Sequence, residues 1–301
     1  MGNYWHYSTD SKYRLNSFCK ILILKNMITL PYTQIINLKS KYNDFEYSLF
    51  IRVPNDYKNN KKSYPTLFLL DPEYLFSICH NIRKIYENYI IIGIGHKDLD
   101  FKELDDEART RRNDINRTRD FLPWKLDKNL FKKDVAKSTV EEIVNASGNA
   151  QEFAEFINQR VIDLIDTKFR TTKDRVLVGH SFAGVFASFM LYCYPDNFSK
   201  YIIITPVLAK EYYVQKEMFD AFKKKPPSSK KIAYFSIGGE EKDDRMDDYT
   251  GTLKNNCLKI GESPDITSKV EVIDGEDHVS VVTPSIWRGL KFFDSENKNI
   301  L

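Results

Sequence analysis

The sequence predicts an α/β fold: a mostly parallel β-sheet with an N-terminal antiparallel hairpin and helices on both faces. Short apolar runs rich in β-branched and aromatic residues recur along the chain. Such runs are typical of strands buried on both faces, which occur in parallel sheets covered by helices. Helical patterns separate the runs, and this alternation predicts a doubly wound sheet. In that architecture a ligand binds beyond the carboxyl ends of the strands.

The first two strands form the hairpin. Residues 34–40 and 45–53 are separated by Asn43-Asp44, which is a turn signal. The parallel strands are then expected at residues 65–70, 89–94, 175–179, 201–205, 232–237 and 269–273.

Helices are expected in three segments between the strands and in one segment after the last strand. Residues 74–86, 150–167 and 284–294 each carry apolar side chains at helical spacing. Residues 182–194 are apolar on nearly every side, which predicts a helix buried against the sheet.

One large domain accounts for most of the chain. The 301 residues are 42% hydrophobic and 14% aromatic, enough for a sizeable core. We expect an N-terminal extension at 1–30 and a single domain at 31–301. Segments 97–149 and 207–230 read as insertions beside the ligand-binding edge. The Arg-rich part of the first, residues 109–119, is offset by nearby acidic residues and reads as a solvated charged face.

Composition argues against several other classes of protein. A net charge of +3 gives no electrostatic reason to bind nucleic acid. The four cysteines are scattered, so neither a disulfide framework nor a zinc site is expected, and no metal or cofactor is predicted. The apolar run at 21–24 is too short for a membrane span, and no signal peptide is evident, so we expect a cytoplasmic protein.

The strongest catalytic signal surrounds Ser181. The apolar strand at 175–179 runs through Gly179-His180-Ser181 into the predicted helix at 182–194. Strand, Gly-x-Ser turn and helix together form the context of a nucleophile elbow, whose strained turn exposes the serine hydroxyl. Gly179 supplies one small neighbour, and Ala183 stands where a second glycine is usual. Ser181 is therefore the candidate nucleophile, with a helix-capping serine as the plain structural alternative.

A serine hydroxyl needs a base. Of five histidines, only His278 follows Ser181, and in this kind of site the chain order is serine, acid, histidine. His278 also lies just after the strand at 269–273, so it is the candidate general base. His180 is adjacent to Ser181 in sequence, so its side chain should point away and be packed or hydrogen-bonded.

The acid should follow the strand at 232–237. A Gly-x-x-acid spacing from Gly238 selects Glu241 to orient the imidazole. The same loop also offers Glu240, Asp243 and Asp244, and a Ser–His dyad without an acid remains open.

Two backbone N–H groups should stabilise the oxyanion. The first is that of Phe182, at the start of the helix after Ser181. The second should come from the loop after the strand at 65–70. Pro72 in that loop has no N–H and favours an extended Asp71, so the donor is expected from Glu73 or Tyr74.

Further segments match the pattern of a known family. They are Tyr64-Pro65 with Leu69-Leu70-Asp71, Ile92-Gly93-Ile94, Arg117-Thr118-Arg119-Asp120-Phe121-Leu122-Pro123, Gly179-His180-Ser181-Phe182, Tyr194-Pro195-Asp196 with Phe198, Ser236-Ile237-Gly238, and Asp277-His278-Val279-Ser280-Val281-Val282-Thr283-Pro284. Over residues 35–294 the chain resembles the putative-esterase family, which includes esterase D and the enterobactin and salmochelin siderophore esterases.

The resemblance implies an α/β-hydrolase fold, catalytic roles for Ser181 and His278, and a place for Arg119 near the substrate mouth. Three positions depart from the family pattern: Pro72, Ala183 and Val279 stand where glycines are usual.

The expected function is hydrolysis of a small-molecule carboxylic ester through an acyl-enzyme on Ser181. An acyltransferase, or a catalytically weak binding protein on the same fold, is the alternative.

Overall fold

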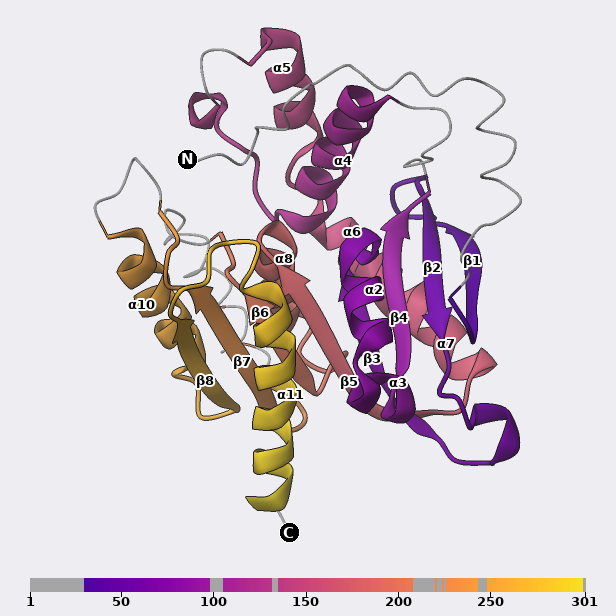
Figure 1. Ribbon diagram of the computed structural model, residues 1–301. Helices are drawn as coiled ribbons and strands as arrows, with labels where there is room; N and C mark the ends of the chain where they lie inside the picture. Colours follow the sequence, from indigo (N-terminus) through magenta and orange to yellow (C-terminus); the bar gives the residue numbers. More distant parts are fainter. Residues whose placement is uncertain are drawn as a thin grey trace.

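The computed structural model describes residues 30–97, 105–131, 135–207, 226–242 and 248–299, together with Asp220 and Lys224. Within these residues the chain forms one eight-stranded sheet with helices on both faces (Figure 1). The α/β class predicted from the sequence is confirmed. All but the last residue of the expected extension at 1–30, and most of the expected insertion at 207–230, lie outside the described residues.

The sheet has the order β1-β2-β4-β3-β5-β6-β7-β8. Its strands are β1 (Thr33–Lys39), β2 (Glu46–Arg52), β3 (Tyr64–Leu70), β4 (Ile90–His96), β5 (Thr171–His180), β6 (Lys200–Ile204), β7 (Lys231–Gly238) and β8 (Ile266–Ile273). The pairs β1–β2 and β2–β4 are antiparallel, and all other neighbours are parallel. The predicted hairpin and all six predicted parallel strands are therefore present.

The helices differ more from the expectation. They are α2 (Pro72–Asn81), α3 (Arg83–Asn88), α4 (Asp106–Phe121), α5 (Lys137–Ala146), α6 (Ala150–Phe156), a π-helical turn (Ile157–Val161), α7 (Ile162–Lys168), α8 (Phe182–Cys193), α10 (Tyr249–Gly261) and α11 (Val282–Asn299), with short 3₁₀ turns at Tyr57–Asn59 and Lys128–Leu130. The single helix expected at 74–86 is two, because Ile82 has extended backbone angles. The sequence did not predict α4, α5 or α10. For α4 the reason is its polar composition, which leaves no apolar stripe from which a helix could be recognised.

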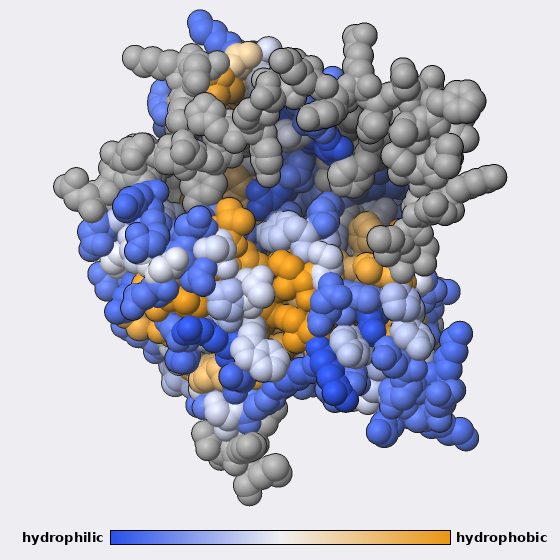
Figure 2. Space-filling model, viewed as in Figure 1, coloured by the Kyte–Doolittle hydropathy of each residue, from blue (hydrophilic) through white to orange (hydrophobic). Residues whose placement is uncertain are grey.

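Each face of the sheet has its own core. On one face α6, α7, α8 and α10 bury aromatic and aliphatic side chains against the strands. On the other face α2, α3 and α11 form a second cluster. Figure 2 shows this second face, where apolar surface gathers between α11 and the α2–α3 pair amid hydrophilic residues.

The segment expected to be an insertion contributes α4 and α5, which lie above the carboxyl ends of the strands (Figure 1). The amino-terminal half of α4 is exposed, as a charged face would be. Its carboxyl-terminal half is buried. There Asp120 accepts hydrogen bonds from the Tyr47 hydroxyl and from His96 Nε2, each at 2.8 Å. These bonds fasten α4 to β2 and β4.

None of the described helices combines the length and apolar character that crossing a bilayer requires. Likewise, nowhere in the described ranges do three or more His, Cys, Asp or Glu side chains gather as a metal site would need.

Candidate active site

Ser181 occupies a sharp turn between β5 and α8. Its backbone angles are φ 60° and ψ −121°, a region that non-glycine residues rarely adopt. The Ser181 N–H donates to the Ile204 carbonyl at 3.0 Å, which fixes the turn to β6. Such strain at a strand–helix junction is the geometry of a nucleophile elbow.

Small side chains around Ser181 make the turn possible. A Cβ on Gly179 would lie 2.1 Å from the Ala183 carbonyl oxygen, closer than any real contact. Glycine is therefore required at 179. Ala183, in contrast, is fully buried without disturbing the turn, so the second glycine of the usual pattern is dispensable here.

His278 and Glu241 meet at the same edge of the sheet. Glu241 follows β7 and His278 follows β8, and His278 Nδ1 lies 3.0 Å from Glu241 Oε2. The His278 ring also packs against that of His180, with 4.6 Å between centroids, so the imidazole is adjacent to the elbow. Of the alternative acids, Glu240 is exposed, and Asp243 and Asp244 lie outside the described residues.

Glu241 is itself held in place. Its Oε1 accepts the Gly238 N–H at 3.0 Å and the hydroxyl of Thr205, which follows β6. The approach between the two loops is close: a Cβ on Gly238 would lie 2.7 Å from the Asp277 carbonyl oxygen. The acid and base loops therefore lock together without room for a side chain at 238.

Burial sets the protonation of the pair. Desolvation lowers the pKa of His278 well below 6.5, and the positive charge of Arg117 lowers it further. The imidazole is therefore neutral at neutral pH, as a general base must be. Burial raises the pKa of Glu241, and the hydrogen bond from the Gly238 N–H opposes that rise.

Two helices begin beside Ser181. Phe182 is the first residue of α8, and Glu73 and Tyr74 belong to the first turn of α2. The Tyr74 hydroxyl lies 2.7 Å from His180 Nδ1, which brings the first turn of α2 against the elbow.

Asp71 precedes α2 in a left-handed conformation, with φ 53° and ψ 58°. The prediction of an extended Asp71 is therefore wrong. The reason is a contact that the local sequence does not reveal: Arg117 of α4 donates to both carboxylate oxygens of Asp71, from Nε and Nη2, each at 3.0 Å. This fork fixes the carboxylate and outweighs the preference imposed by Pro72.

The arginine beside the candidate site is Arg117. Its guanidinium lies 5.6 Å from the centre of the Phe182 ring, and its charge acts on His278. Arg119 is 5% exposed, and its guanidinium donates to Asp120 and to Asn116. No local sequence signal separates the two arginines, because they lie two positions apart on one polar helix.

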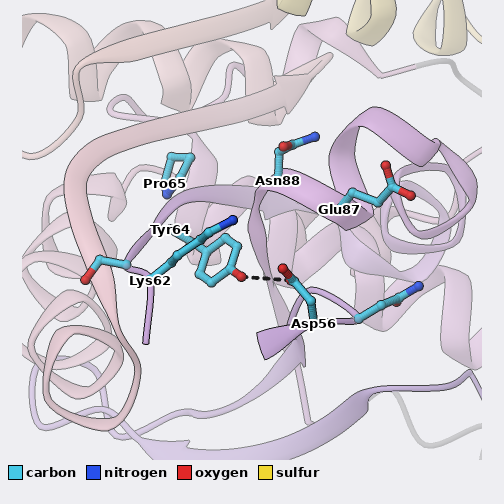
Figure 3. Close-up of a pocket in the computed structure, with 8 residues that line it drawn as sticks. Asp56, Lys62, Tyr64, Pro65, Glu87 and Asn88 are labelled. Carbon is cyan, nitrogen blue, oxygen red and sulfur yellow. Dashed lines mark hydrogen bonds between the residues drawn. The ribbon is translucent and has the colours of Figure 1, made fainter. Parts of the chain in front are cut away.

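A pocket of about 530 Å³ lies elsewhere (Figure 3). It is lined by Asp56, Lys62, Tyr64 and neighbouring polar residues, and the Tyr64 hydroxyl donates to Asp56 at 2.8 Å. Tyr64 begins β3, whereas Ser181 follows the end of β5, and the two strands are parallel. The pocket thus lies at the amino ends of the parallel strands, whereas Ser181 lies at their carboxyl ends.

Comparisons with known proteins agree with this geometry. A family model described as "Putative esterase" matches residues 120–276, more than half of the chain and short of His278. No curated protein sequence matches the chain.

Solved structures share the fold. They include the BES protein from Bacillus cereus, with 22% identity, 89% of this chain and 97% of that chain covered, and a TM-score of 0.71. An IroE-like serine hydrolase from Shewanella oneidensis has 21% identity, coverage of 86% and 79%, and a TM-score of 0.67. Siderophore hydrolase EstB from Aspergillus nidulans has 19% identity, coverage of 89% and 96%, and a TM-score of 0.67. The fold is therefore the α/β-hydrolase fold, as the sequence predicted.

Proposed function

Because the chain belongs to the putative-esterase family of serine ester hydrolases, we propose that Ser181, His278 and Glu241 are the catalytic triad with which it hydrolyses a carboxylic ester. The observation that carries the assignment is the strained Ser181 in the elbow whose His180 ring packs against a neutral, buried His278, and the Nδ1 of His278 is bonded to Glu241. These features supply a nucleophile, a base and the group that orients the base.

In the proposed first step, Ser181 Oγ attacks the ester carbonyl carbon and its proton passes to His278 Nε2. The tetrahedral intermediate then collapses, the bond to the alcohol oxygen breaks, and His278 returns the proton to the departing alcohol. Water, deprotonated by His278, attacks the acyl-enzyme. The bond between the acyl carbon and Ser181 Oγ then breaks, His278 returns the proton to Oγ, and the acid is released. Glu241 holds the tautomer with hydrogen on Nδ1 and stabilises the imidazolium that forms twice in the cycle.

The oxyanion is stabilised, in this proposal, by the Phe182 N–H and by an N–H of the first turn of α2. Either Glu73 or Tyr74, both in that first turn, supplies the second N–H. The left-handed Asp71 turns the chain so that α2 presents its amino end at this place. Arg119 is not part of this arrangement, and Arg117 takes its place beside the substrate.

The proposed substrate is a small-molecule ester, and the proposed compartment is the cytoplasm. Cys79, Cys193 and Cys257 carry free thiols, as proteins in reducing compartments do. An acyltransferase would use the same residues but pass the acyl group to an alcohol. Hydrolysis of p-nitrophenyl esters of increasing acyl length, with and without an added alcohol, distinguishes the two reactions.

A fluorophosphonate probe tests the nucleophile. We expect covalent labelling of the protein and its complete loss in Ser181→Ala, with turnover falling by several orders of magnitude, on the order of 10⁴–10⁶. Ser77→Ala is the matched control, because Ser77 is an exposed serine of nearby α2. Labelling that persists in Ser181→Ala would exclude Ser181 as the nucleophile.

A further inference from the structure

His180, the residue before the nucleophile, bridges two parts of the candidate site. It is 6% exposed. Its Nδ1 lies 2.7 Å from the Tyr74 hydroxyl, and its Nε2 lies 2.7 Å from the main-chain carbonyl oxygen of His278. As expected from its place in the elbow, the ring is hydrogen-bonded.

The chemistry of the partners fixes the tautomer. A carbonyl oxygen only accepts, so His180 Nε2 carries the hydrogen. Burial, together with the charges of His278 and Arg117, lowers the pKa of His180 to about 3, so the ring is neutral and Nδ1 is an acceptor. The Tyr74 hydroxyl therefore donates to Nδ1. A phenol is protonated at neutral pH, so that proton stays in place.

This chain of two hydrogen bonds joins three segments that are remote in sequence: the first turn of α2, the end of β5 and the base loop after β8. The α2 end is fixed in turn by Asp71 and the fork of Arg117. The base loop is otherwise held through Glu241 and through Asp277, whose carboxylate accepts two N–H groups of its own turn.

We propose that His180 is a positioning residue for the ester hydrolysis. By donating to the His278 carbonyl it holds the base loop at the distance from Ser181 that proton transfer requires, and by accepting from Tyr74 it ties the oxyanion-binding turn to the same point. The proposal rests on the triad assignment above. A displacement of about 1 Å at such a site costs on the order of 100-fold in rate, so the link matters although it touches no reacting atom.

Three substitutions at His180 test whether the hydrogen bond that it donates to the His278 carbonyl matters, or only the volume of its side chain. The amide of His180→Gln reaches about as far as Nε2 and can donate to the His278 carbonyl. The shorter amide of His180→Asn reaches only the position of Nδ1, and His180→Met fills the space without a polar hydrogen. We expect kcat to fall roughly 10–100-fold in the Asn and Met variants, with KM little changed, and to be largely retained in the Gln variant.

Tyr74→Phe removes only the hydroxyl at the other end of the link. We expect a smaller fall in kcat and a change in the ¹⁵N chemical shift of His180 Nδ1, since that nitrogen loses its hydrogen bond. Tyr64→Phe is the matched control, because it removes a hydrogen-bonded tyrosine hydroxyl at the far edge of the sheet. That variant should keep wild-type kcat and the wild-type His180 signals.

The outcomes decide between the two proposals. Equal kcat values for the Gln and Met variants, or an Nδ1–H tautomer in the wild-type protein, would overturn the role of His180 while Ser181→Ala still abolished labelling. If Ser181→Ala keeps its label, the triad itself fails. Thermal unfolding of each variant, measured alongside, shows whether a lost kcat merely follows a lost fold.

Discussion

At the scale of single residues, the site depends on charges placed close to a buried imidazole. His278 is 8% exposed, and in the proposed mechanism it must be unprotonated to accept the proton of Ser181. Burial and the cation of Arg117 both disfavour its protonated form. Arg117 thus does two things at once: it holds Asp71 through its fork, and it adds to the effect of burial in lowering the pKa of the proposed base.

The pH dependence of kcat/KM should reveal this second effect. Activity falls as His278 gains a proton, and because its pKa is lowered, the acidic limb should lie below pH 6.5. Arg117→Gln removes one lowering charge, so the limb should move upward by roughly half a pH unit or more. The measurement is the pH profile of each enzyme between about pH 4 and 8.

Arg111→Gln removes the same charge from an exposed position of α4, paired with Glu142, and should leave the limb where it is. A limb that stays in place in Arg117→Gln, or moves to lower pH, would contradict the electrostatic role of Arg117.

At the scale of elements, the elbow between β5 and α8 leaves no space for a side chain at position 179. We expect Gly179→Ala to lower stability by about 1–3 kcal/mol, because its Cβ has no space beside the Ala183 carbonyl. Fluorophosphonate labelling should slow as the serine is displaced. Urea unfolding and labelling kinetics measure the two effects.

Ala183→Gly is the matched control for Gly179→Ala, since it introduces the glycine that is usual at this position and adds no atoms to the turn. It should cost no more than about 1 kcal/mol, the usual penalty for a glycine in a helix, and keep labelling near wild type. Normal labelling and stability in Gly179→Ala would show that the turn tolerates a side chain.

Elements with a strong local pattern could be predicted from sequence, and those set by distant partners could not. The strands and Ser181 followed from apolar runs and the elbow motif, and the order of the chain selected His278. The left-handed Asp71 did not, because its cause is Arg117, 46 residues away. For the same reason the sequence could not distinguish Arg117 from Arg119: they lie two positions apart on one polar helix, and only tertiary packing separates their roles.

At the scale of the whole molecule, Asp120 joins the helical segment above the sheet to the sheet itself. It is fully buried and contacts Tyr47 of β2, His96 of β4 and Arg119. Asp120→Asn leaves the guanidinium of Arg119 buried without its counter-charge, so we expect a loss of about 3–5 kcal/mol in the free energy of unfolding. Because α4 carries Arg117, kcat should fall as well. Urea unfolding and steady-state kinetics test this.

Asp106→Asn breaks an ion pair with Arg109 on the exposed part of the same helix and should cost no more than about 1 kcal/mol. A similar cost for both variants would mean that Asp120 does not fasten α4 to the sheet.

Four neighbouring strand ends each contribute one link to the site: Ser181 after β5, Thr205 after β6, Glu241 after β7 and His278 after β8. No two of these strands are joined by a short hairpin, so the links come together only once distant stretches of the chain have paired. Pairings of this kind form late and slowly during folding. The rate at which reactivity toward a fluorophosphonate returns during refolding therefore reports on the pairing of these strands. The labelled fraction at each time is the fraction of molecules in which β5 to β8 have paired in their native register.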